Sequence, residues 1–269
     1  MIEFLKYVLI GIIQGITEPL PISSSGHIMI AREFMNMPAV DYFLEIFLHV
    51  ASLIAILILF RKRILELIVG NINYIFKRNK DYVKDFHYAL MILIGIIPAG
   101  IVGVLFKETI ETRILVYGLL AIGISLLVTG SFLLLVQSES TENTRKNITP
   151  LDALTVGLFQ VVALLPGISR SGSTFVGGLF RKLEFKALVE YSFMLFIPVT
   201  AGSLLLEIIA FDGTVDHPVS GLMISFVLSG VLTFFALRWF VNMVKKGNLK
   251  YFAYYCFVVG TLSIIIYFI

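Results

Sequence analysis

The sequence predicts an all-α polytopic membrane protein with six full transmembrane helices and two re-entrant helical hairpins in an inverted-topology repeat. Of its 269 residues, 58% are hydrophobic and only 14% are charged, and the mean hydropathy is +0.94, well outside the range of soluble domains. Apolar runs that could cross a hydrocarbon core of about 30 Å recur along the chain. Two other apolar segments are interrupted at their centres. We therefore expect a single integral membrane domain over residues 1–269.

Six uninterrupted apolar stretches have the length of a full span. They are residues 42–60, 89–106, 114–136, 188–210, 219–240 and 250–269. Lysines and arginines are densest in the predicted loop from Arg61 to Lys84, which the positive-inside rule places in the cytoplasm. Counting spans from there puts the basic segments near Arg145, Arg181 and Lys245 on the same side. These charges indicate topology, and no nucleic-acid partner is expected because that would need a dense basic face.

The two interrupted segments, residues 4–34 and 150–181, each carry proline, glycine and serine in their middle. Broken backbone at membrane depth leaves N–H and C=O groups unpaired, which is tolerated only where protein or a water-filled cavity satisfies them. Each segment is therefore predicted to be a re-entrant helical hairpin. The count of spans has the first hairpin enter from outside and the second from inside.

Residues 11–26 and 157–172, at the centres of the two hairpins, align without gaps at an offset of 146 residues, with six identical positions. These pair Gly11, Gln14, Ile22, Ser23, Ser25 and Gly26 with Gly157, Gln160, Ile168, Ser169, Ser171 and Gly172. Small residues also recur in ordinary helix packing, but packing motifs lie inside unbroken helices and these lie beside prolines. We expect two repeats, about 1–136 and 150–269, with a site near the bilayer midplane.

Both hairpins are predicted to restart a helix at a serine cap. Pro19 ends the first half-helix near Glu18, and Ser23 is a natural N-cap for a helix that begins Ser24, Ser25, Gly26. In the second hairpin Pro166-Gly167 breaks the helix. There Ser169 is the corresponding N-cap, followed by Arg170, Ser171, Gly172, Ser173 and Thr174. Two helix N-termini aimed at one point would form an anion site, and phosphate is the usual occupant.

The repeat places Ser24 opposite Arg170, so one side chain could attack a phosphate while the other holds it. An arginine at membrane depth is costly and is a functional candidate by default, and its planar fork suits two phosphate oxygens. Glu18 could accept the proton of Ser24 or bind a divalent cation. His27 could act as a base or protonate a leaving group, and the choice between Glu18 and His27 stays open.

A second pair of polar residues, Glu45 and His49, lies four residues apart at the start of a span. Structural, interfacial and functional roles are equally compatible with that spacing.

Three motifs resemble those of the bacterial undecaprenyl-diphosphate phosphatases, the BacA/UppP family linked to bacitracin resistance. They are Gln14-Gly-Ile-Thr-Glu18, Pro21-Ile-Ser-Ser-Ser-Gly-His27 and Pro166-Gly-Ile-Ser-Arg-Ser-Gly-Ser-Thr174. The resemblance covers almost the whole chain, and three signatures in the right order are specific. One departure is Gln14, which stands where many relatives have glutamate.

The resemblance implies hydrolysis of a polyprenyl diphosphate to the monophosphate and inorganic phosphate, which recycles the lipid carrier of cell-wall synthesis. It implies that Ser24 is the nucleophile, that Arg170 clamps the phosphate, and that Glu18 and His27 are acid–base or metal partners. A divalent cation, Mg²⁺ or Ca²⁺, would be held by Glu18 and Gln14. The protein would lie in the bacterial cell membrane with its site open to the outer face.

Two other functions fit the same pattern. Inverted repeats with half-helices are common in secondary transporters, so the protein could instead flip a phosphorylated lipid or carry a small anion. A non-catalytic scaffold is the third possibility. The small residues from Gly95 to Gly103 would permit a homodimer.

Overall fold

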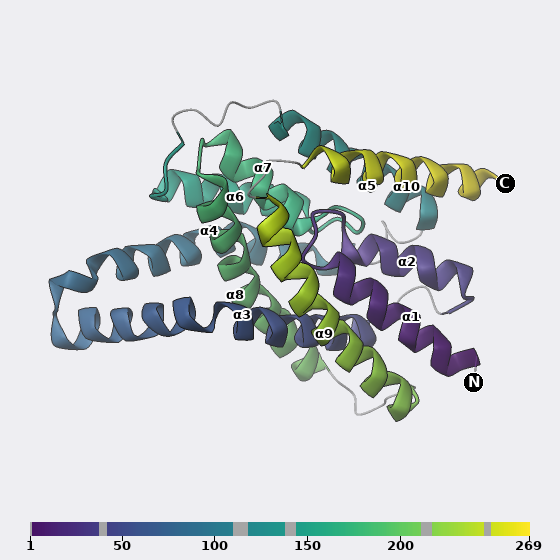
Figure 1. Ribbon diagram of the computed structural model, residues 1–269, viewed down its shortest axis with the longest axis horizontal. Coiled ribbons are helices and arrows are strands. Elements are labelled where there is room, and N and C mark those ends of the chain that lie inside the picture. Colours follow the sequence, from purple (N-terminus) through teal and green to yellow (C-terminus); the bar gives the residue numbers. More distant parts are fainter. Residues whose placement is uncertain (1, 38–41, 110–117, 138–143, 211–216, 245–248) are drawn as a thin grey trace.

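The computed structural model describes residues 2–37, 42–109, 118–137, 144–210, 217–244 and 249–269 (Figure 1). Over these ranges the chain is helical, with one short 3-10 helix, η1 (Lys80–Tyr82), and a single isolated β-bridge between Arg145 and Leu183. The α-helices are α1 (Ile2–Thr17), α2 (Ser24–Phe34), α3 (Tyr42–Lys77), α4 (Val83–Thr109), α5 (Gly118–Gln137), α6 (Pro150–Val162), α7 (Arg170–Phe180), α8 (Phe185–Ala210), α9 (Val219–Val244) and α10 (Lys250–Phe268).

Six helices within the described residues are long and apolar enough to cross a membrane, namely α3, α4, α5, α8, α9 and α10. The prediction of an all-α protein with six full spans is therefore confirmed. The helices pack in long pairs: α5 lies along α10, α1 along α9, and α4 along α6 (Figure 1). Parts of the connecting segments used for the topology, such as 211–216 and 245–248 with Lys245, lie outside the described residues.

The predicted loop from Arg61 to Lys84 is wrong over most of its length, because α3 continues as a helix to Lys77. With about 1.5 Å of rise per residue, its 36 residues span about 54 Å, more than a hydrocarbon core requires. Tertiary contacts hold this extension: Arg63 donates to Asp85 of α4 at 3.2 Å and to Glu190 of α8 at 2.9 Å. In Figure 1 the C-terminal part of α3 and the N-terminal part of α4 project together as an antiparallel pair.

The two interrupted segments form short helical hairpins, α1–α2 and α6–α7, with the same local structure at each restart. The Ser23 hydroxyl accepts a hydrogen bond from the N–H of Gly26 at 3.3 Å, and Ser169 accepts from Gly172 at 3.1 Å. Both predicted N-caps are thus confirmed. The side from which each hairpin enters the membrane stays a prediction, as does the inverted repeat.

The tips of the two hairpins touch at their breaks. A methyl group at Gly26 would lie 3.1 Å from the Cα atom of Gly167, which has a positive φ of 86°. The Ser171 hydroxyl donates to the carbonyl oxygen of Leu20 at 3.2 Å. These contacts hold the N-termini of α2 and α7 side by side, as the sequence predicted.

The second hairpin is anchored at its base by Asp152, which is fully buried. Arg145 donates to both of its carboxylate oxygens and Arg181 donates at 2.9 Å, while Thr149 completes a capping box with it. Burial favours the protonated carboxyl, but the hydrogen bonds from Arg145, Thr149 and Arg181 outweigh burial and hold the pKa of Asp152 below its usual range. The ion pairs tie the start of α6 to the end of α7.

The small-residue face from Gly95 to Gly103, expected to permit a homodimer, is used inside the chain at Gly95. A methyl group at Gly95 would meet Tyr191 and Leu195 of α8, and one at Gly157 of α6 would meet the Gly95 carbonyl oxygen. These glycines therefore allow α4, α6 and α8 to approach closely. A homodimer stays a prediction, and Gly95 is not available to support it.

Candidate active site

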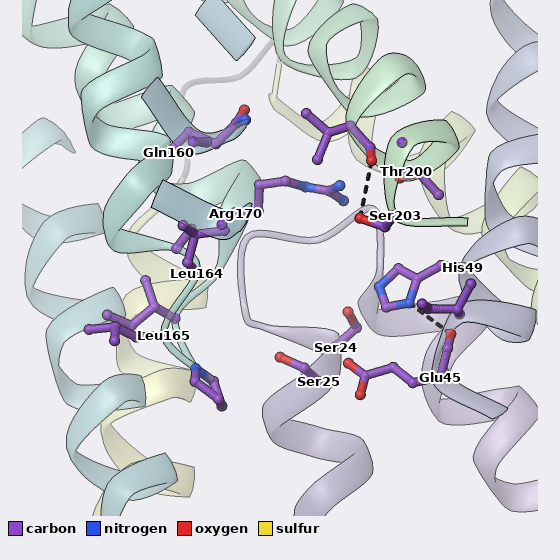
Figure 2. A pocket seen from close by; sticks show the side chains of 18 of the residues that line it. Ser24, Ser25, Glu45, His49, Gln160, Leu164, Leu165, Arg170, Thr200 and Ser203 are labelled. Carbon is purple, nitrogen blue, oxygen red and sulfur yellow. Dashed lines mark hydrogen bonds between the residues drawn. The ribbon is translucent and has the colours of Figure 1, made fainter. Parts of the chain in front are cut away.

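A cavity of about 890 Å³ opens at the hairpin tips (Figure 2). Its polar end is formed by the two breaks: Glu18, Ser23, Ser24, Ser25, Ser169, Arg170 and Ser171 line it. Its walls are apolar and come largely from α4 and α8, where a methyl group added at Gly100 or Gly202 would meet nothing within 4 Å. In Figure 2 Arg170 reaches into the cavity from α7, opposite Ser24 and His49. A polar head and a long apolar body could both be accommodated.

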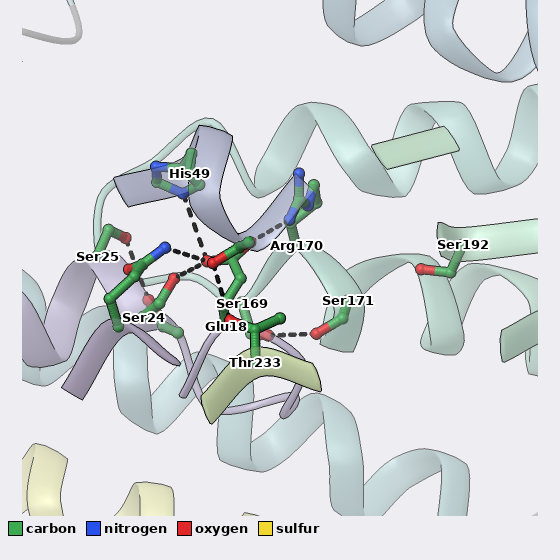
Figure 3. A network of polar contacts seen from close by, with 12 residues as sticks. Glu18, Ser24, Ser25, His49, Ser169, Arg170, Ser171, Ser192 and Thr233 are labelled. Carbon is green, nitrogen blue, oxygen red and sulfur yellow. Dashed lines mark hydrogen bonds and ion pairs between the residues drawn. The ribbon is translucent and has the colours of Figure 1, made fainter. Parts of the chain in front are cut away.

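Glu18 lies at the centre of the polar end (Figure 3). Its carboxylate is 2% exposed and contacts groups from four helices. The Ser24 hydroxyl of α2 donates to Oε2 at 2.5 Å, and Nη2 of Arg170 in α7 donates to Oε1 at 2.6 Å. Nε2 of Gln14 in α1 donates to Oε2 at 3.1 Å, and Nε2 of His49 in α3 is 3.4 Å from the same oxygen. One carboxylate thus joins the predicted nucleophile to the predicted clamp.

Arg170 is held on two sides. Besides its ion pair with Glu18, its guanidinium lies 3.8 Å from the centre of the Phe196 ring, which is itself buried. A guanidinium over an aromatic face is attracted by the ring quadrupole, more strongly when desolvated. Arginine has five N–H donors, and the Glu18 contact uses one nitrogen, so the fork is positioned and charged for an anion in the cavity.

Six of the predicted site residues do not line the cavity. Gln14 lies behind Glu18, and the N–H groups of Gly26 and Gly172 are bound by their capping serines. Ser173 and Thr174 are buried in the packing of α7, where the Thr174 hydroxyl lies 2.5 Å from that of Ser192. These five support the site from behind, and their role in substrate binding stays a prediction.

His27 is the sixth, and it points towards α10. Its ring stacks on Tyr255 with centroids 5.5 Å apart, and Nε2 lies 2.8 Å from the Tyr255 hydroxyl. Its Nδ1 lies 2.7 Å from the carbonyl oxygen of Ser23. Ser24 lines the cavity, whereas the contacts with Tyr255 hold His27 outside it. An acid–base role for His27 stays a prediction, and the geometry favours Glu18 as the base.

Gln160 and His49 also line the cavity, although the sequence did not single them out as site residues. Gln160, the repeat partner of Gln14, is 2% exposed, and within the described residues both polar atoms of its amide lack a hydrogen-bond partner. Buried polar groups are normally satisfied, so this amide is available to a ligand. The other is His49, whose spacing from Glu45 did not distinguish a site from a structural role.

The pair Gln14 and Glu18, expected to bind a divalent cation, does not fit one in this arrangement. Mg²⁺ and Ca²⁺ take six or more oxygen ligands, whereas the Glu18 oxygens already face a guanidinium, a hydroxyl, an amide nitrogen and an imidazole nitrogen. In the part of the chain that the structure describes, there is no group of three or more His, Cys, Asp or Glu residues suited to a metal. Cation dependence stays a prediction.

Fold and site together define a polytopic membrane protein in which a cluster of serines, Glu18 and Arg170 lies at the junction of two helix N-termini, with an apolar cavity beside it. The chain matches the family model described as bacitracin resistance protein BacA over residues 7–262, and it belongs to that family. It is 42% identical to the undecaprenyl-diphosphatase of Oceanobacillus iheyensis over 96% of this chain and 95% of the relative. It is also 39% identical to undecaprenyl-diphosphatase 2 of Bacillus thuringiensis over 97% of both chains.

Proposed function

We propose that this protein hydrolyses undecaprenyl diphosphate to undecaprenyl phosphate and inorganic phosphate, the activity for which its relatives are named. The observation that carries the proposal is the 2.5 Å contact between the Ser24 hydroxyl and the Glu18 carboxylate, which also holds Arg170. A nucleophile, an acceptor for its proton and a phosphate clamp thus meet in one cavity.

In the proposed first step, Oγ of Ser24 attacks the terminal phosphorus while Glu18 takes the hydroxyl proton. The bond between that phosphorus and the bridging oxygen breaks, and undecaprenyl phosphate leaves with the bonding electron pair. Arg170 stabilises the negative charge on the equatorial oxygens. The N-termini of α2 and α7 add their positive dipole ends, and the Gln160 amide can donate to the same phosphate.

In the second step, water attacks the phosphorus of the phosphoserine. Glu18 has by then passed its first proton to the departing phosphate or to solvent, and it accepts a proton from this water. The Ser24–phosphorus bond breaks, the serine oxygen is reprotonated, and inorganic phosphate is released. The same carboxylate therefore serves both half-reactions, which requires only that it stay within hydrogen-bond distance of Ser24.

The apolar part of the cavity supports a lipid substrate and an outward opening. Ile97, Ile101 and Val104 of α4 face the cavity together with Leu205 and Leu206 of α8. Because the positive-inside rule places the start of both helices in the cytoplasm, these residues lie in their outer halves. We propose that the undecaprenyl chain leaves the cavity between α4 and α8 and that the diphosphate enters from the outer leaflet.

The test is phosphate release from undecaprenyl diphosphate by purified protein in detergent. Ser24→Ala should lower kcat by at least about 10³-fold, while Ser131→Ala, a matched change at an exposed serine of α5 outside the cavity, should stay near the parent rate. Hydrolysis by Ser24→Ala at the parent rate would refute the nucleophile. If the parent releases no phosphate but moves labelled lipid across vesicle bilayers, the protein is a transporter that uses the same arginine.

A further inference from the structure

His49 is fixed by its own helix before it reaches the site. Its Nδ1 lies 2.8 Å from the backbone carbonyl oxygen of Glu45, one turn earlier in α3. A carbonyl oxygen can only accept a hydrogen bond, so Nδ1 is the donor in this contact. The ring orientation is therefore set by the α3 backbone, and Nε2 is directed at the other end.

At that end, Nε2 of His49 lies 3.4 Å from Oε2 of Glu18, the oxygen that accepts the Ser24 hydroxyl. A carboxylate oxygen also accepts, so the ring makes both contacts as the imidazolium, with an N–H on each nitrogen. Glu18 itself follows the last residue of α1 and belongs to the turn between the hairpin helices. The orientation of its carboxylate therefore depends on side-chain contacts. Arg170 holds Oε1, whereas Gln14 and His49 hold Oε2.

The contacts of Gln14 and His49 with Oε2 of Glu18 come from different parts of the structure. Gln14 lies in α1, four residues before Glu18, so it moves with the first hairpin. His49 comes from the spanning helix α3 and links the turn to a different element (Figure 3). His49 also lines the cavity, whereas Gln14 does not.

We propose that His49 is a positioning residue of this site, whose Nε2 holds Oε2 of Glu18 in the orientation that receives the Ser24 proton. This inference rests on the proposed hydrolysis and adds a residue from outside the two hairpins to it. His49 acts through Glu18, so its loss lowers the rate of the chemical step and leaves the binding of the lipid nearly unchanged.

Two amide substitutions separate the two ends of the ring. In His49→Gln the amide nitrogen can occupy about the position of Nε2, so this variant retains a donor towards Glu18. The shorter asparagine places its amide near the position of Nδ1, so His49→Asn retains only the contact with the Glu45 carbonyl. His49→Leu removes both. A hydrogen bond to a charged group contributes a factor of about 10 to 150.

In the phosphate-release assay, His49→Leu and His49→Asn should lower kcat by about 10- to 100-fold with KM within about threefold of the parent. His49→Gln should recover most of the parent kcat. Melting temperatures in detergent should be similar for His49→Gln and His49→Asn. Equal kcat values for these two variants would overturn the proposal, because the end of the ring facing Glu18 would then have no particular importance.

A double-mutant cycle identifies the residue through which His49 acts. In a Glu18→Gln background, His49→Leu should cause less than about a threefold further loss, because the oriented carboxylate is already gone. A full additional loss would show that His49 acts independently of Glu18 and would refute the inference. Failure of the proposed function gives a different result: Ser24→Ala would then retain the parent rate, whatever His49 does.

Discussion

Replacing Glu18 by glutamine tests the centre of the site, because it removes one charge without changing the size of the side chain. The carboxylate is 2% exposed and accepts from Ser24, Arg170 and Gln14. An amide has one accepting oxygen and one donating nitrogen, so at least one of these donors must face another donor. Ser24 also loses the group that accepts its proton.

The loss of the proton acceptor lowers the reaction rate, whereas the loss of the ion pair lowers the stability of the protein. General base catalysis contributes about 10²- to 10⁴-fold, so kcat should fall by about 10³-fold. Removing one partner of a buried ion pair costs about 3–5 kcal/mol. Arg170 is 25% exposed at the cavity and can be hydrated there, so the loss of stability should lie near the lower end of that range.

The assay is phosphate release at saturating lipid, with thermal unfolding of the same samples in detergent. Glu190→Gln is a matched control, since Glu190 accepts from Arg63 at 2.9 Å in an ion pair that does not line the cavity. We expect it to keep the parent kcat. A folded Glu18→Gln protein with kcat within threefold of the parent would refute the role of Glu18 as the base, and an equal loss in both variants would assign the effect to folding.

Three further changes test other parts of the structure. Gly202→Leu should fill the apolar wall of the cavity and lower hydrolysis of undecaprenyl diphosphate far more than that of a short-chain prenyl diphosphate, and equal losses would contradict the proposed path of the tail. Gln14→Glu should place two buried carboxylates together, so hydrolysis should fall in chelator and recover with Ca²⁺ or Mg²⁺; a response identical to that of the parent would contradict this. Asp152→Asn should lower the melting temperature at pH 7. Because the pKa of Asp152 is lowered in the folded state, its contribution is present above the unfolded pKa of about 4 and is lost as the pH falls through the folded value. The difference in melting temperature between parent and Asp152→Asn should therefore shrink below about pH 4. A constant difference would refute the claim that the ionised Asp152 carboxylate stabilises the folded protein.

The features that the sequence predicted correctly depend on local chemistry. Six apolar runs, two breaks and two serine caps are set by residues within a few positions of each other, as at Ser23 and Gly26. The extension of α3 was missed because a basic, polar segment is typical of a loop. The extension is held through Arg63 by Asp85 and Glu190, which are far from Arg63 in sequence.

The site was predicted only in part, because several of its contacts also join residues that are far apart in the sequence. The repeat aligned Ser24 with Arg170. His49 and Phe196 lie outside all three motifs, and their contacts with Glu18 and Arg170 come from separate helices. The direction of His27 could not be derived from its spacing, because it depends on where Tyr255 of α10 lies. A polar residue within an apolar span was the one available signal for His49.

In the proposed mechanism, Glu18 is both the ion-pair partner of Arg170 and the base for Ser24. With no phosphate in the cavity, Arg170 needs Glu18 because a buried guanidinium without a counter-charge is costly. A diphosphate brings its own negative charge to the same guanidinium and competes for it, which weakens the hold of Arg170 on Oε1. A carboxylate that shares its cation binds a proton more readily, so arrival of the substrate makes Glu18 a better acceptor for the Ser24 proton.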